Sequence, residues 1–194
     1  MTTLTNKYNM IVAADENWCI GKNGKLLDHF PEDIRFFKST TTNKIVIMGR
    51  NTQESLPNKS YLKNRINIVL TKNSKWQCLV CQEDDNTYEL DLPSIEQIPD
   101  FITVFQCIQN DTGKYSGYSF TNDNIFVIGG GQVYKQFLEK DMINTIYLTK
   151  IHHEYNGDTF IPNLYELGFK KSVDILPEAI NENGVKYSIS ILTK

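Results

Sequence analysis

The feature that most constrains this chain is an apolar strand that leads through three consecutive glycines into a helix. Residues 124–128 read Asn-Ile-Phe-Val-Ile, then come Gly129, Gly130 and Gly131, and a helical pattern occupies 132–138. Such a strand-turn-helix unit is typical of α/β folds. Glycines there let the backbone approach a pyrophosphate, and the helix start offers free N–H groups. The pattern fits a ligand-free tight turn equally well and does not match the G-x-G-x-x-G fingerprint.

Strand and helix patterns alternate along most of the chain. The sequence predicts strands over 8–14, 44–48, 64–71, 124–128, 145–151, 170–175 and 185–192, and helices over 30–38, 53–56, 101–108 and 132–138. Residues 181–184, Asn-Glu-Asn-Gly, are typical of a hairpin turn between the last two strands. This order predicts an α/β fold with a mainly parallel sheet and an antiparallel C-terminal hairpin.

The length of 194 residues fits one domain over 1–194. The pattern weakens over 74–124, so we expect that segment to elaborate a smaller fold, with surface loops at 83–86 and 110–117. Four apolar residues in the segment recur at helical spacing and predict one buried helix face: Phe101, Val104, Phe105 and Ile108.

Composition limits the classes of partner. The chain has 20 Lys plus Arg and 23 Asp plus Glu, a net charge of -3, whereas general nucleic-acid binders are usually basic. No apolar run reaches the length of a membrane span, and residues 1–8 lack the apolar centre of a secretory signal. We therefore expect a small-molecule partner, no nucleic acid or membrane, and a cytoplasmic location. The oligomeric state, monomer or higher, is not predicted.

The cysteines are expected to be free thiols in a reducing compartment: Cys19, Cys78, Cys81 and Cys107. The spacing of Cys78 and Cys81 is that of redox and zinc motifs. Four zinc ligands would need a second pair, which the chain lacks, so we expect no metal.

A second polar cluster follows two other predicted strands. Residues 49–52 read Gly-Arg-Asn-Thr at a helix start, and Thr71 and Lys72 end the next strand. Together with 129–131, these residues would suit a ligand that carries several phosphates. Arg50 and Lys72 are equally consistent with solvated surface charges.

Asp33 is a third candidate. It lies in the first turn of the helix predicted over 30–38, four residues before Phe37, so both side chains share a face to which Ile34 adds apolar character. A carboxylate that faces an apolar pocket has a raised pKa, which suits binding of a cationic heterocycle. A negative charge in the first turn also stabilises a helix without any further role.

The ordered set of motifs resembles dihydrofolate reductase. The matching segments are Ile20–Gly24, Pro31–Lys38, Ile47–Thr52, Leu62–Asn67, Val127–Tyr134, Tyr147–Thr149 and Gly157–Thr159. They span nearly the whole chain except 74–124. The resemblance implies the three-layer fold of that family and reduction of 7,8-dihydrofolate to 5,6,7,8-tetrahydrofolate by hydride transfer from NADPH. It also implies a place in one-carbon metabolism and thymidylate synthesis, and antifolates as inhibitors.

The resemblance further implies roles for residues on the substrate side. Asp33 would bind the 2-amino group and a ring N–H of the pterin, Thr149 would hydrogen-bond the carboxylate or the pterin amino group, and Arg65 would bind the glutamate tail of folate as a fork. Further apolar contacts to the substrate would come from Ile11, Val12, Phe37, Leu56 and Ile128.

For the cofactor, the resemblance implies a site built from Ala13, Ile20, Gly21, Gly49, Arg50, Asn51, Thr52, Leu70, Thr71, Lys72, Gly129, Gly130, Gly131, Gln132, Val133 and Tyr134. Among these, Arg50, Thr52, Thr71 and Lys72 would hold the phosphates, including the 2′-phosphate. A cis peptide would join the first two glycines of 129–131, and residues 15–30 would form a mobile lid over the nicotinamide and the pterin.

One departure affects the catalytic centre. Leu27 and Asp28 stand where the family reads Pro-Trp. We expect Asp28 to disturb the water near the pterin, with two nearby carboxylates raising one pKa and Lys25 offsetting the charge. Substrate binding or hydride transfer should then be weaker and partly restored by Asp28→Trp. Two alternatives stay open: a pterin- or cofactor-binding protein with little turnover, and a pyrimidine reductase of riboflavin synthesis.

Overall fold

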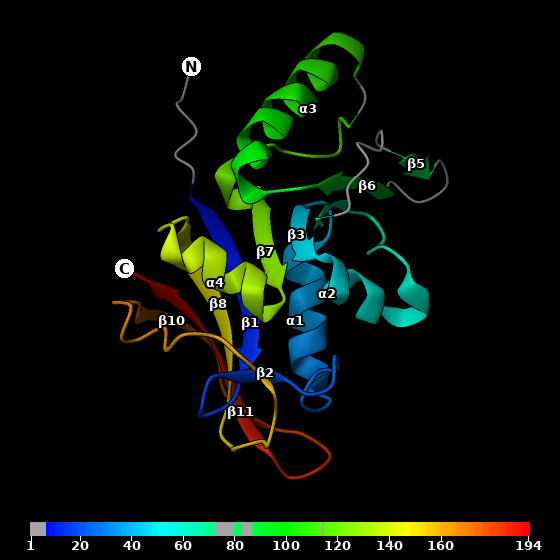
Figure 1. The fold of residues 1–194 in the computed structure, drawn as a ribbon. Coiled ribbons are helices and arrows are strands. Elements are labelled where there is room, and N and C mark those ends of the chain that lie inside the picture. Colours follow the sequence, from blue (N-terminus) through cyan, green and yellow to red (C-terminus); the bar gives the residue numbers. More distant parts are fainter. Residues whose placement is uncertain (1–6, 73–79, 83–86, 114) are drawn as a thin grey trace.

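A nine-stranded sheet organises the molecule. The computed structural model describes residues 7–72, 80–82, 87–113 and 115–194 (Figure 1). The sheet has the order β10-β11-β8-β1-β7-β3-β4-β6-β5. Its strands are β1 (Tyr8–Ala14), β3 (Ile45–Gly49), β4 (Ile66–Leu70), β5 (Val80–Gln82), β6 (Thr87–Leu92), β7 (Ile125–Gly129), β8 (Ile143–Ile151), β10 (Lys170–Ile180) and β11 (Lys186–Thr193).

The pairing confirms the predicted sheet type. Strands β8, β1, β7, β3, β4 and β6 run parallel, and β11 pairs antiparallel with both β8 and β10. The parallel order brings the carboxyl ends of β1, β3, β4, β7 and β8 to one edge of the sheet, where α/β proteins usually bind ligands.

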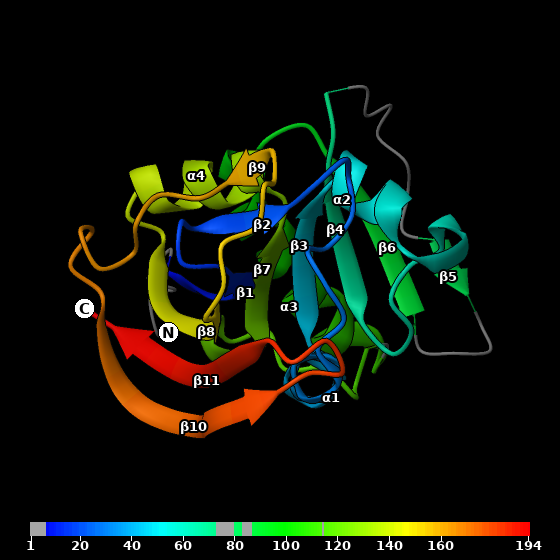
Figure 2. The same ribbon diagram turned by 90° about the horizontal axis from the view of Figure 1, so that it is seen from below.

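Helices flank the sheet in layers. They are α1 (Pro31–Thr41), α2 (Arg50–Ser55), α3 (Ile98–Thr112) and α4 (Gly131–Glu139), with short 3-10 turns at Pro57–Lys59, Ile95–Gln97 and Asn122–Asn124. Figure 2 shows α4 and α1 on opposite sides of the sheet. The central strands read as continuous apolar runs because both of their faces are covered by these layers.

The two faces of β3 show how the layers are held. Ile45 and Ile47 belong to the main core, which they share with residues of α3 and α4. The alternate residues Val46 and Met48 point to the other face and pack with Val69 and the loop after α2. All four are fully buried, so β3 contributes hydrophobic stabilisation on both faces of the sheet.

The segment 74–124 contains more regular structure than the sequence indicates. Its strand β6 extends the sheet next to β4, and α3 continues to Thr112, so the loop predicted from residue 110 begins later. Ile98, Ile102 and Phe105 form the buried face of α3, whereas Val104 is 49% exposed, so its predicted burial was wrong. Residues 83–86 and the side chains of Cys78 and Cys81 lie outside the described residues.

Two short strands order the loop that precedes α1. Strand β2 (Cys19–Gly21) pairs with β9 (Thr159–Phe160) to form a separate two-stranded sheet. Gly157 permits their approach, because a Cβ at this position would lie 2.1 Å from the sulfur of Cys19. Neither strand was predicted, since two or three residues carry no readable periodicity.

None of the helices in the part of the chain that the structure describes is long and apolar enough to cross a membrane. The described free thiols are the buried Cys19 and the exposed Cys107.

Candidate active site

The carboxylate of Asp33 lies where α1 approaches the carboxyl ends of β1 and β8. Pro31 starts α1, which places Asp33 in the first helical turn. The hydroxyl of Thr149 on β8 donates a hydrogen bond of 2.5 Å to Asp33 Oδ1. Thr149 is buried and pairs in register with Ala13 of β1. The sheet thus fixes the partner that orients the acid.

Burial raises the pKa of Asp33, and the hydrogen bond from Thr149 opposes the shift in part. The second oxygen of the carboxylate accepts no hydrogen bond from the described residues. An acid in this condition gains from a ligand that supplies N–H donors or positive charge. The sequence-based expectation of a raised pKa for this group is therefore confirmed.

Tyr134 lies near this acid. Its hydroxyl donates a 2.7 Å hydrogen bond to the carbonyl of Ile11, and it is buried. Burial raises the pKa of the Tyr134 phenol, and the negative charge of Asp33 raises it further. The tyrosine, predicted to lie beside the nicotinamide, therefore links the first turn of α4 to β1 close to the predicted substrate acid.

The apolar residues predicted to contact the substrate lie on strands and helices of the same sheet layers. Ile11 and Val12 are buried on β1, and Phe37 of α1 is half-buried. Leu56, at the end of α2, and Ile128, near the end of β7, pack against the same small cluster of the sheet. Ile34, expected to add to the apolar side of α1, is 43% exposed.

Arg65 is buried and is held by hydrogen bonds along its fork. Its Nε donates to the hydroxyl of Thr41 at 3.0 Å, and Nη1 donates to the carbonyl of Lys63 at 2.6 Å. Nη2 has long contacts of 3.4 Å to the Lys38 carbonyl and the Thr42 hydroxyl. The guanidinium also lies 5.8 Å from the centre of the Phe37 ring. It therefore has a fixed orientation beside the wall that Phe37 forms.

Glycines form a close junction at the carboxyl ends of β3 and β7. A Cβ on Gly49 would lie 3.1 Å from Val133, one on Gly130 3.1 Å from the Thr52 hydroxyl, and one on Gly131 3.0 Å from Thr159. Gly130 is the N-cap residue of α4, and the peptide between Gly129 and Gly130 is cis, as the resemblance implied.

This junction fits the pyrophosphate of a dinucleotide. The half-buried start of a nine-residue helix offers N–H donors, the hydroxyl of Thr52 lies close to its cap residue Gly130, and no Cβ fills the space. Ile20 of β2 lies near Gly131, 3.8 Å from the position of a Cβ on that glycine. The residues present therefore fit the cofactor that the resemblance implies.

Arg50 is held by an acid that the sequence analysis did not identify. It starts α2, and its Nη2 forms an ion pair with Asp91 of β6. Tyr61 and Glu89 lie close by: Tyr61 raises the pKa of Arg50 and lowers that of Glu89, which burial raises. The sequence Tyr88–Leu92 alternates apolar and acidic residues, which is the signal that would have revealed this strand and its acidic face.

The other predicted cofactor residues lie around the same edge. Gly21 is buried in β2, Val133 is buried in α4, and Leu70 and Thr71 are half-buried at the end of β4. Asn51, Lys72 and Gln132 are exposed.

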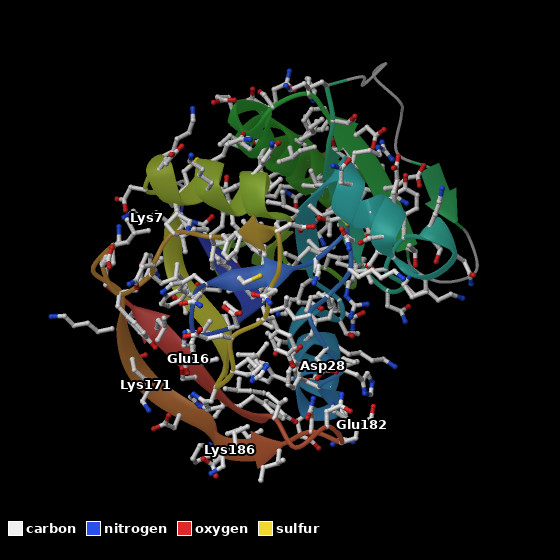
Figure 3. The ribbon with its side chains drawn as sticks, turned by 60° about the horizontal axis from the view of Figure 1, so that its bottom comes forward. Lys7, Glu16, Asp28, Lys171, Glu182 and Lys186 are labelled. Carbon is white, nitrogen blue, oxygen red and sulfur yellow. The ribbon has the colours of Figure 1, made fainter. Side chains whose placement is uncertain are left out.

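Asp28 is bound to the C-terminal hairpin, and its pKa is lowered. Its carboxylate accepts hydrogen bonds of 2.9 Å from Tyr155, Asn181 and Asn183 and one of 2.8 Å from the N–H of His29. Partial burial opposes the shift, but the bonds from Asn183, His29, Tyr155 and Asn181 lower the pKa of Asp28 to about 2. Figure 3 shows Asp28 at the start of α1 beside Glu182 of the hairpin turn. The coupling of two nearby carboxylates that was expected to raise one pKa is not a cause of either shift, because donors surround Asp28 and burial raises the pKa of Asp33.

The loop between β1 and α1 is fastened at its base. Asp15 is buried and accepts the N–H groups of Asn17, Cys19 and Tyr155, each at 2.8 Å. Lys150 donates to the carbonyl of Asp15 at 2.6 Å. These bonds fix both ends of the turn before β2, whereas residues 22–26 are exposed. Within the lid predicted over 15–30, the contacts of Asp15 therefore hold the base, and the exposed residues lie at 22–26.

Comparisons with known proteins agree with this arrangement. The model of the dihydrofolate reductase family matches residues 7–194. The dihydrofolate reductase of Haemophilus influenzae is 33% identical over 187 residues, which cover 96% of this chain and 98% of that protein. The bifunctional dihydrofolate reductase-thymidylate synthase of Daucus carota is 32% identical over 188 residues, and the match spans 93% of this chain but 32% of that protein.

A solved structure gives the same result for the fold. Dihydrofolate reductase from Enterococcus faecalis, complexed with NADP(H) and RAB-propyl, aligns with a TM-score of 0.68 and 26% identity over 98% of this chain and 97% of that one. The sheet order, the carboxylate on α1 and the glycine junction had pointed to the same family. The chain belongs to the dihydrofolate reductase family.

Proposed function

We propose that this chain catalyses the NADPH-dependent reduction of 7,8-dihydrofolate to 5,6,7,8-tetrahydrofolate, a step that supports one-carbon metabolism and thymidylate synthesis. The observation that carries the proposal is the half-buried, desolvated carboxylate of Asp33, which Thr149 orients at the carboxyl edge of the sheet that also carries the glycine junction. An acid for the pterin and a site for a dinucleotide then occupy the same edge. The cofactor, when bound, supplies the hydride.

On the substrate side, Asp33 accepts hydrogen bonds from the 2-amino group and a ring N–H of the pterin. Because the carboxylate is desolvated and has one donor in the free protein, charge-assisted bonds from the substrate restore its preference for the ionised state. The negative charge favours a protonated pterin ring. Asp33 thus orients the ring and sets its electrostatics, and the proton for the imine nitrogen comes from water.

The remainder of the substrate follows the apolar wall. Ile11, Phe37, Leu56 and Ile128 contact the pterin and the aminobenzoyl ring, and Arg65 binds the carboxylate of the glutamate tail. The bonds to Thr41 and Lys63 hold the guanidinium in one orientation before the substrate arrives, which lowers the entropy lost on binding. Diaminopyrimidine antifolates bind through Asp33 by the same geometry.

On the cofactor side, Gly130, Gly131 and the free N–H groups of α4 hold the pyrophosphate with Thr52. Ala13, Ile20 and Tyr134 position the nicotinamide near Asp33. The exposed part of the loop over 22–26 excludes bulk water when it closes over both rings.

Further proposals concern the chain as a whole. Residues 1–194 form one domain in which 74–124 is an elaboration, supported by the pairing of β6 with β4 in the common sheet. The free thiols of Cys19 and Cys107 support a reducing, cytoplasmic location.

The test is steady-state oxidation of NADPH by the purified chain with 7,8-dihydrofolate. Turnover proportional to enzyme concentration is expected, and Asp33→Asn should reduce it strongly. Binding of NADPH and dihydrofolate without turnover would instead identify a binding protein. Failure of a diaminopyrimidine antifolate to bind would favour a pyrimidine reductase with another substrate.

A further inference from the structure

We propose that Asp91 determines the specificity for the cofactor. Its ion pair with Arg50 lowers the preference for a 2′-phosphate, so that dinucleotides without this phosphate bind as well. The inference rests on the proposed function, because it assigns Arg50 to the cofactor site. It concerns a residue of β6, which belongs to the segment that elaborates the fold and which no motif of the family resemblance covers.

The geometry begins with the ion pair itself. Arg50 is the first residue of α2, directly after Gly49 at the carboxyl end of β3, and its Nη2 contacts Asp91 Oδ2. The side chains of Arg50 and Asp91 are 29% and 18% exposed, so water screens the pair less than a surface pair. The register that aligns Asp91 with Val69 places the acid beside the end of β4, next to the predicted phosphate residues Thr71 and Lys72.

A second acidic residue adds negative charge beside the ion pair of Arg50 and Asp91. Glu89 and Asp91 are alternate residues of β6 and therefore lie on the same face of the strand. Tyr61 lies close enough to Arg50 and Glu89 to shift the pKa of both, and Arg50 Nη1 donates to Gln53 Oε1 at 3.1 Å. Each of the terminal guanidinium nitrogens thus has an acceptor from the protein.

A 2′-phosphate would enter this cluster at a disadvantage. It brings nearly two negative charges to an arginine that Asp91 already neutralises, with Glu89 close by. The phosphate must either displace Asp91 or accept the repulsion of like charges. Lys72 is the other cation predicted for this end of the site. It is exposed, so water and salt screen its attraction for a phosphate more strongly.

A ribose without the phosphate has the opposite chemistry. Its 2′- and 3′-hydroxyls are hydrogen-bond donors, and a carboxylate accepts two such bonds. An acidic residue that binds the ribose 2′-hydroxyl is how many dinucleotide folds recognise NAD, whereas an arginine accommodates the 2′-phosphate of NADP. This chain places both residue types in one ion pair, so we expect NADH and NADPH to bind with similar affinity.

The pair could instead hold Arg50 in the orientation that a phosphate needs. The two roles predict opposite signs for Asp91→Asn. If Asp91 competes with the phosphate, its neutral amide should strengthen NADPH binding, whereas a positioning acid should weaken it on removal. Glu96→Gln is a matched control, because Glu96 lies after the same strand, forms an exposed ion pair with Lys140, and loses the same charge.

The experiment is calorimetric titration of the full chain with NADPH and with NADH, without folate, for wild type, Asp91→Asn and Glu96→Gln. Thermal melting checks that each variant is folded. We expect wild-type dissociation constants within about tenfold of each other, and Asp91→Asn should tighten NADPH at least about fivefold without tightening NADH. Glu96→Gln should change either constant by less than about twofold.

Three results would contradict the inference. They are a wild-type preference for NADPH well above tenfold, unchanged or weaker NADPH binding by Asp91→Asn, and an equal gain for both nucleotides in that variant. All three leave the proposed function intact, because NADPH still binds. Absence of binding by both nucleotides would overturn the proposed function together with the inference.

Discussion

Asp28 and Asp33 lie on either side of the start of α1, yet their pKa values move in opposite directions. The pKa of Asp28 is lowered to about 2, whereas burial raises that of Asp33. The two groups differ in how many donors reach them: four residues donate to Asp28 and one donates to Asp33. The comparison shows that a carboxylate saturated with hydrogen bonds supports the fold, whereas an unsaturated one is prepared for a ligand.

The linkage between pKa and stability has opposite signs at the two sites. The folded-state pKa of Asp28 lies below its ordinary value of 3.8, so its stabilisation is complete above that value and is lost as the pH falls through about 2. Asp33 has a raised folded-state pKa, so its contribution to stability falls as the pH rises from 3.8 towards the raised value. At neutral pH, Asp28 stabilises the folded state and Asp33 destabilises it.

The largest effect is expected for Asp33→Asn on catalysis. Loss of the charged acceptor should reduce kcat/KM about 10²- to 10⁴-fold, because the substrate loses its charge-assisted bonds and the ring loses its electrostatic bias. The free energy of unfolding at pH 7 should increase, since the buried charge is removed. Steady-state kinetics and urea denaturation measure the two changes. A less active but also less stable variant would indicate a structural acid.

Asp28→Ala should affect stability more than chemistry. Tyr155, Asn181 and Asn183 lose their shared acceptor, and we expect about 2 kcal/mol less free energy of unfolding, a moderate value because the site is partly exposed. Asn181→Ala tests the same contact from the hairpin side. If the two effects are additive in the double variant, the contact between the loop and the hairpin contributes no coupling energy and our assignment fails.

The same contact revises the expectation for Asp28→Trp. An indole cannot accept the four donors, so this substitution should lower stability by a similar amount and leave turnover unimproved. A gain in activity at unchanged stability would show that the family residue restores the water network after all.

A smaller effect is expected for Thr149→Val. The variant keeps the shape of the side chain but removes the 2.5 Å hydrogen bond to Asp33, so kcat/KM should fall about fivefold, which corresponds to about 1 kcal/mol. Because that bond lowers the pKa of Asp33, its loss should raise this pKa further and move the pH profile of kcat/KM to higher pH. An unshifted profile would mean that Thr149 acts by packing alone.

The sequence was sufficient for the elements whose pattern is local and strong. The apolar runs of β1, β3, β4 and β7 are buried on both faces, and Pro31 with its two following acids marks the start of α1. The roles given to Asp33 and to the glycines of 129–131 came from the resemblance of the ordered motifs to dihydrofolate reductase, because each motif alone also fitted a capping acid or a tight turn.

Partners that come from distant parts of the chain could not be predicted in this way. Asn181 and Asn183 reach Asp28 from the C-terminal hairpin, and no feature of the sequence near Asp28 indicates these contacts. Asp91 was missed for a different reason, because the alternation in β6 was short and lay in a segment without motifs. Its contact with Arg50 depends on the pairing of β6 with β4, which only the tertiary structure supplies.

The most direct test of the central claim compares the two acids as ligand-binding groups. The dissociation constant of a 2,4-diaminopyrimidine antifolate should be measured at neutral pH for wild type, Asp33→Asn and Asp28→Asn, with folding verified for each. We expect Asp33→Asn to weaken binding at least about 100-fold, because two charge-assisted hydrogen bonds are lost, and Asp28→Asn to change it less than about threefold. Equal affinity of wild type and Asp33→Asn would contradict the assignment of Asp33 as the acid that binds the pteridine.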